Sequence, residues 1–101
     1  MWLMVMFDLP VGEEKERKAA NRFRHFLLDQ GFEMAQFSVY MKHCVGKEQA
    51  EAIIRKVGDN APSTGRIHIL GFTDKQYGRI VCFEGRKLVD PPKNPAQLAL
   101  F

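Results

Sequence analysis

The sequence has few cysteines, no long apolar run and no glycine-rich phosphate loop, and each absence excludes a class of protein. Only Cys44 and Cys82 occur among 101 residues, too few for a disulfide framework, so we expect both to be reduced core residues of a cytoplasmic protein. No apolar stretch approaches the roughly 20 residues that cross a membrane. The apolar N-terminus lacks the basic flank and small-residue cleavage site of a signal peptide, so we expect no leader and no membrane partner.

Several catalytic and binding motifs are also missing. The three histidines, His25, His43 and His68, show no metal-ligand spacing with either cysteine. Ser38 does not lie in a nucleophile elbow, and no strand carries the aromatic pattern of RNA-recognition domains. Carboxylates and basic side chains are therefore the stronger candidates for chemistry.

Length and composition are those of one small globular domain. Apolar residues make up 46% of the chain and charged residues 27%, which are ordinary values for a folded domain with a modest core. The net charge of +3 is a mild bias toward anionic partners.

Hydrophobic periodicity predicts the order strand, helix, one long or two short strands, helix, strand, strand. Residues 2–8 are mostly apolar, which predicts a central strand buried on both faces. A break within the second strand region, near Phe37 and Ser38, has no turn residue to support it. The order predicts an α+β, ferredoxin-like βαββαβ sandwich with an antiparallel sheet and both helices on one face. The predicted elements span residues 2–8, 13–30, 32–45, 47–57, 66–72 and 79–84, the last running back along 66–72.

The first predicted helix has an apolar stripe that should face the core. Its members are Ala19, Phe23, Phe26, Leu27 and Gln30.

The domain is expected to span residues 1–85, and residues 86–101 form a proline-rich C-terminal arm. The stretch "DPPKNP" predicts a stiff, extended connector. The apolar ending "QLALF" is expected either to add a short strand to a sheet edge, in this chain or in a second copy, or to fray.

Asp8 ends the first predicted strand, where a carboxylate is costly to bury unless it is paired or bound to a metal. It either faces a ligand crevice at the strand's carboxyl end or caps the turn "DLPVG". Mg²⁺ commonly takes one or two carboxylates plus waters and phosphates. Glu33 and Glu84 are weak candidates for a second acid, whereas a two-fold dimer would supply a second Asp8. Such a pair holding Mg²⁺ could activate water for phosphodiester hydrolysis.

Basic side chains crowd the first predicted helix. Those at spacings of 3, 4 and 3 share one face opposite the apolar stripe, and two arginines flank that face. This pattern is either a solvated face with i,i+4 ion pairs or a phosphate-binding ridge. The shared face holds Lys15, Lys18, Arg22 and His25, and the flanking residues are Arg17 and Arg24.

Four stretches together resemble the second of the two universal CRISPR-associated proteins (the Cas-two family), in the form found in type II systems. They are "VMFDLPV", "RKAANRFRHFLLDQGF", "QFSVYMK" and "GRIHILGFTDKQYGRIVCFEG", and they cover about residues 1–85. The resemblance implies a ferredoxin-like fold, and hence a strand break within residues 32–45, and it implies a two-fold homodimer.

The resemblance also implies functional residues. Asp8 matches the family's metal-binding aspartate, one from each subunit, and Ser38 falls near the metal cleft, so both are candidate catalytic residues with Mg²⁺ as cofactor. Family members are described as metal-dependent endonucleases on RNA or double-stranded DNA. They also bridge the partner CRISPR integrase and hold the DNA of a new spacer during adaptation. Alternatives are a non-catalytic nucleic-acid-binding scaffold and a regulatory domain that binds a small ligand. The candidate nucleic-acid-binding residues are Lys15, Arg17, Lys18, Arg22 and Arg24.

Overall fold

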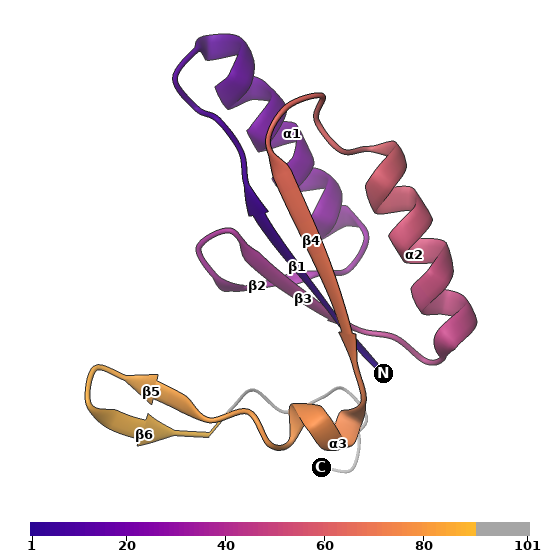
Figure 1. Ribbon diagram of the computed structural model, residues 1–101, viewed down its shortest axis with the longest axis vertical. Helices are drawn as coiled ribbons and strands as arrows, with labels where there is room; N and C mark the ends of the chain where they lie inside the picture. Colours follow the sequence, from indigo (N-terminus) through magenta and orange to yellow (C-terminus); the bar gives the residue numbers. More distant parts are fainter. Residues whose placement is uncertain (91–101) are drawn as a thin grey trace.

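The computed structural model describes residues 1–90 (Figure 1). The predicted terminal strand in "QLALF" lies outside these residues. The elements in chain order are β1 (Trp2–Asp8), α1 (Glu14–Asp29), β2 (Glu33–Gln36), β3 (Val39–His43), α2 (Lys47–Asp59), β4 (Arg66–Phe72), α3 (Asp74–Tyr77), β5 (Cys82–Glu84) and β6 (Lys87–Val89). None of the helices in this part of the chain is long and apolar enough to cross a membrane.

The first four strands form one antiparallel sheet in the order β2-β3-β1-β4. β1 is central, as predicted, because it pairs with β3 on one side and with β4 on the other. Helices α1 and α2 pack on the same face of this sheet, since residues from both share one core cluster with β1. The predicted α+β, ferredoxin-like fold is confirmed.

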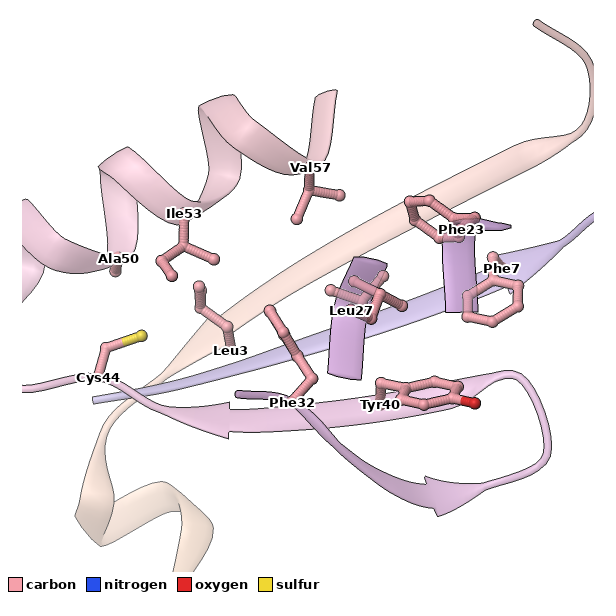
Figure 2. Packing of buried hydrophobic residues seen from close by; sticks show 11 residues of the cluster. Leu3, Phe7, Phe23, Leu27, Phe32, Tyr40, Cys44, Ala50, Ile53 and Val57 are labelled. Carbon is pink, nitrogen blue, oxygen red and sulfur yellow. The ribbon is translucent and has the colours of Figure 1, made fainter. Parts of the chain in front are cut away.

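The core lies between the two long helices and alternate residues of β1. Leu3, Val5 and Phe7 are buried, and the Phe7 ring packs edge-on against Phe23 of α1, with ring centroids 5.3 Å apart. Figure 2 shows the side chains of Ala50, Ile53 and Val57 of α2 pointing toward the same cluster. Each large side chain buried here contributes roughly 1.5–3 kcal/mol of hydrophobic free energy.

Helix α1 begins and ends where local chemistry favours it. The Glu16 carboxylate accepts a hydrogen bond from the Glu13 amide (2.9 Å), and the acidic first turn suits the positive end of the helix dipole. Gly31 ends the helix in a left-handed conformation, with φ at 89°. The buried stripe contains Phe23 and Leu27 as predicted, with Ala20 buried in place of Ala19.

The two cysteines are free, as expected, but the expectation that both lie in the core is wrong for Cys82. Cys44 is fully buried in the core cluster, whereas Cys82 is only partly buried.

The prediction that β1 is buried on both faces is wrong. The residues of β1 that point away from the long helices include Met6 and Asp8, and both are exposed. Among residues 1–90, this second face, here called the open face, is covered at one end only, where Trp2 stacks on Tyr77 of α3 with ring centroids 4.0 Å apart. The apolar run in β1 therefore mixes core residues with residues of a largely uncovered sheet face.

Residues 32–45 form two strands, as the family resemblance required. The turn between β2 and β3 places Ser38 in the left-handed region, with φ at 63°. Its carbonyl accepts a hydrogen bond from the Phe7 amide (3.1 Å), which ties the turn to β1. The sequence carries no signal for this turn, because serine occupies a position that glycine or asparagine usually takes.

The chain after β4 departs from the prediction. Residues 74–77 form the short helix α3, capped by Thr73, whose Oγ1 accepts a hydrogen bond from the Gln76 amide (3.1 Å). The predicted strand 79–84 does not run back along β4. Instead its last three residues form β5, which pairs with β6 in a separate two-stranded hairpin around Gly85. The hairpin lies beyond α3, away from the long helices (Figure 1).

Candidate functional site

Asp8 is the last residue of β1 and lies on the open face. The pairing of β1 with β4 sets it opposite Arg66, and sets Met6 opposite His68. The close approach of the two strands depends on Gly65, which has φ at +94°. A Cβ at Gly65 would lie 2.8 Å from the carbonyl oxygen of Asp8, so only glycine fits beside the end of β1.

The Asp8 carboxylate has no partner within residues 1–90. It is exposed, and in this part of the chain it accepts no hydrogen bond and forms no ion pair, even with the opposing Arg66. Nothing in the described residues therefore supports the turn-capping interpretation. The carboxylate does not hold the fold together, and it is available to a ligand.

Asp8 and Ser38 line the same depression on the open face, about 290 Å³ in volume. Arg66 and His68 of β4 also line it, and Phe37 forms part of its wall. The structure thus brings together the two residues that the resemblance singled out. It adds two that the sequence analysis missed, although the alternation in "RIHILGF" already placed Arg66 and His68 on one face.

Residues 1–90 of one chain do not build a complete divalent-metal site. Among residues 1–90, no group of three or more His, Cys, Asp or Glu side chains converges. The depression holds one carboxylate, the Ser38 hydroxyl and the His68 imidazole. Mg²⁺ accepts a single protein carboxylate when waters and phosphate oxygens complete its coordination, so this donor set fits a shared or open site. Glu33 and Glu84 do not line the depression.

The side chains of the predicted basic face of α1 are exposed and lie next to one another along the helix. Lys18, Arg22 and His25 line one shallow depression along the helix, and Lys15 is exposed one turn earlier. Lys18 also forms an i,i+4 ion pair with Glu14 (3.5 Å), a solvent-exposed contact of little energetic value.

Arg17 has a structural contact that the sequence did not reveal. Its Nη1 donates hydrogen bonds to the carbonyl oxygens of Val11 (3.2 Å) and Gly12 (3.4 Å). The guanidinium thereby fixes the loop that connects β1 to α1. Replacing Arg17 would disturb this loop as well as remove a charge.

Arg24 lies over the ring of Phe37, with its guanidinium carbon 5.8 Å from the ring centroid. The two side chains line a second groove on α1, of about 500 Å³, together with Arg17, Lys18 and Asn21. This groove adjoins the Asp8 depression because Phe37 lines both.

A separate charged cluster lies at the opposite end of β1. The Met1 ammonium donates a hydrogen bond to Asp74 Oδ1 (2.9 Å), and His43 Nε2 lies 3.1 Å from the same oxygen. The hydrogen bond from the ammonium, helped by the His43 contact, holds the pKa of Asp74 below its usual value. This cluster fixes α3 to the sheet. It lies at the end of β1 opposite to Asp8.

The fold and the Asp8 carboxylate, unpartnered within residues 1–90, define a small ferredoxin-like protein with a carboxylate-bearing depression beside a basic helix. The family model described as CRISPR associated protein Cas2 matches residues 1–80. The chain is 50% identical over its whole length to the CRISPR-associated endoribonuclease Cas2 of Paracidovorax avenae, covering 94% of that protein. It is 45% identical to the protein of that name from Parvibaculum lavamentivorans, with both chains covered completely, and 44% identical over its whole length to that of Flavobacterium psychrophilum, of which it covers 88%.

The chain therefore belongs to the Cas2 family of CRISPR-associated proteins, which confirms the resemblance found in the sequence.

Proposed function

We propose that this chain is a Mg²⁺-dependent endonuclease of CRISPR adaptation that hydrolyses phosphodiester bonds as a homodimer. The observation that carries the proposal is the Asp8 carboxylate, which is exposed and unpartnered within residues 1–90 and lies in a depression with Ser38 and His68. The name endoribonuclease, borne by the relatives above, supports nuclease activity and favours RNA as the first substrate to test.

A second copy of the chain completes the site. Met6 and Leu70 are 38% and 45% exposed on the open face, and the β-sheet register sets Met4 between Met41 and Leu70. This apolar strip lies on the same face as Asp8. An isologous dimer through the strip would bury it against its own copy and bring the two Asp8 residues to one interface.

The residues of the depression have distinct roles in this proposal. The two Asp8 carboxylates hold Mg²⁺, which when bound polarises a phosphodiester and makes a bound water easier to deprotonate. Arg66 binds a phosphate oxygen through its planar guanidinium. The Ser38 hydroxyl donates a hydrogen bond to the substrate, and the His68 imidazole offers a further hydrogen-bonding group beside it.

The test is a metal titration of cleavage with matched variants. Wild type, Asp8→Ala and Asp8→Asn are incubated with single-stranded RNA, single-stranded DNA and duplex DNA, over a range of Mg²⁺ and in EDTA. We expect both Asp8 variants to lose on the order of 100-fold or more in rate, as when a group that stabilises transition-state charge is removed. Glu84→Gln, on the distant hairpin, should cleave like wild type. Full cleavage by a purified Asp8→Ala preparation would remove the nuclease proposal.

A second function is favoured by the basic face of α1. In this role the dimer holds DNA and bridges the partner integrase without cutting, and Asp8 is dispensable. Charge reversal at Lys15, Lys18 and Arg22 should weaken DNA binding and reduce the salt slope by about 0.9 for each phosphate of B-DNA that the protein no longer neutralises. Arg17 is left intact because it holds the β1–α1 loop.

The control for these reversals changes the same kind of charge elsewhere. Arg55→Glu with Lys56→Glu on α2 should leave the salt slope unchanged. Unaltered DNA binding after the α1 reversals would remove the scaffold role of this face. A monomer that ignores nucleic acid would favour the small-ligand interpretation instead.

A further inference from the structure

Phe37 is a large aromatic side chain held out in solvent. It is 83% exposed at the tip of the β2–β3 turn. The turn is anchored, because the carbonyl of Ser38 accepts a hydrogen bond from the Phe7 amide of the central strand and Ser38 itself is fixed in a left-handed conformation. The ring is further restrained by the Arg24 guanidinium, 5.8 Å from its centroid. It is therefore presented on a supported turn.

The position of the ring connects the two surfaces already described. Phe37 lines the depression that holds Asp8 and Ser38, and it also lines the α1 groove with Arg24 and Lys18. A polynucleotide whose backbone followed the α1 groove to the Asp8 depression would pass directly over the ring.

We propose that Phe37, held by Arg24, is a base-stacking platform that selects single-stranded nucleic acid at the Asp8 site. The base beside the bound phosphate leaves its neighbours and stacks on the ring, while Arg24 and Lys18 contact phosphates. Bases inside a duplex are already stacked and paired, so they cannot use the platform without the cost of opening the helix. Stacking on an aromatic face tolerates every base, so the platform selects single strands over duplexes without a preference for base sequence. The inference rests on the proposed function in one respect only, namely that the phosphate bound beside the stacked base is also the phosphate that is cleaved.

The surroundings of the ring favour a nucleic acid over a protein surface. The groove side of Phe37 carries Arg17, Lys18, Arg24 and Asn21, with Glu14 as the single acid, already paired with Lys18. An exposed ring set among guanidinium and ammonium groups is the arrangement by which single strands are bound, through stacking together with backbone charge neutralisation.

The experiment measures binding in EDTA, so that no cleavage takes part. The full chain is titrated into a labelled single-stranded oligonucleotide, the matching duplex, and an abasic strand of equal length that keeps the phosphates. Phe37→Ala and Phe37→Leu should bind the single strand about 5- to 150-fold more weakly, the equivalent of losing one stacked base. Phe37→Tyr, which keeps the ring, should bind like wild type. Neither the duplex nor the abasic strand should distinguish these variants.

Three results would overturn the platform. The first is unchanged single-strand affinity in Phe37→Ala. The second is an equal loss of affinity for the single strand, the duplex and the abasic strand, which would mean that the substitution disturbs the phosphate contacts alone. The third is a change of sedimentation coefficient in Phe37→Ala and Phe37→Leu without nucleic acid, which would assign the ring to contact with a second copy.

Failure of the platform and failure of the nuclease proposal are separable. In EDTA, Phe37→Ala should weaken single-strand binding by the same factor in the Asp8→Ala background as in wild type. This result is expected whether or not the protein is a nuclease. Phe37→Ala should lose affinity for the single strand in EDTA, where no cleavage takes part, so this loss does not depend on whether the protein is a nuclease.

Discussion

The carbonyl oxygen of Asp8 lies 2.8 Å from the place a Cβ on Gly65 would occupy, and the Leu9 Cδ2 atom lies 2.7 Å from it. Gly65 therefore sets how closely the start of β4 approaches the end of β1, and with it the position of the Asp8 carboxylate beside Arg66 and His68.

Gly65→Ala should destabilise the protein and displace Asp8. The substitution combines a positive φ with a collision against backbone, so we expect a loss of about 1–3 kcal/mol in the free energy of unfolding. Gly58→Ala in α2 is the matched control, because a Cβ there meets nothing within 4 Å. It should stabilise the helix by about 0.5–1 kcal/mol. Urea unfolding measures both, and equal stability of the two variants would contradict the close approach.

Ser38 can be tested for strain and for chemistry with two substitutions. Both Ser38→Gly and Ser38→Ala remove the hydroxyl, but only glycine is relaxed at a φ of 63°. Ser38→Gly should therefore be more stable than Ser38→Ala by about 1 kcal/mol. If the hydroxyl binds substrate, both variants should cleave more slowly than wild type. Wild-type cleavage by the glycine variant would show that the hydroxyl has no part in the reaction.

The two cysteines should differ sharply in reactivity. Burial raises the pKa of the Cys44 thiol, which keeps it protonated as well as inaccessible. A thiol reagent at neutral pH should modify Cys82 in the native protein, and modify Cys44 only after urea is added. In Cys82→Ser the fast reaction should disappear. A fast reaction that survives this substitution would contradict the placement of Cys44 in the core.

Asp74 should make stability depend on pH at the acid end. Because the pKa of Asp74 is lowered in the folded state, its contribution is complete above its ordinary value of about 4 and is lost as pH falls through the lowered pKa. The carboxylate is 53% exposed, so its contacts contribute at most about 1 kcal/mol each. Asp74→Asn should be less stable than wild type at pH 7, and the difference should vanish once pH falls below the lowered pKa of Asp74. A difference independent of pH would contradict the ionic contact with the Met1 ammonium.

Strands and helices with a regular apolar pattern could be predicted from the sequence. The bounds of β1 follow from its apolar run, those of β4 from alternating apolar residues, and α1 from its stripe and from Gly31. The β2–β3 break could not be found this way, because a serine holds the left-handed position. The β5–β6 hairpin was missed although Gly85, at φ 61°, is the glycine that a tight hairpin turn requires.

The candidate site was only partly visible in the sequence. Asp8 stands out because a charged residue ends an apolar strand, and this needs no knowledge of contacts. Arg66 and His68 become part of the site only through the register of β4 against β1, which a single sequence does not fix. The loop contact of Arg17 depends on side-chain geometry and has no periodic signature.

The central claim is that two Asp8 carboxylates from two chains form one cleavage site. Wild type and Asp8→Ala are mixed in equal amounts, allowed to exchange subunits, and compared with wild type in a Mg²⁺-dependent cleavage assay at fixed total protein. If both carboxylates are needed, only wild-type homodimers cleave, and the mixture should keep about a quarter of the wild-type rate. A mixture that keeps about half the wild-type rate would mean that each chain carries its own site, and would contradict a shared one.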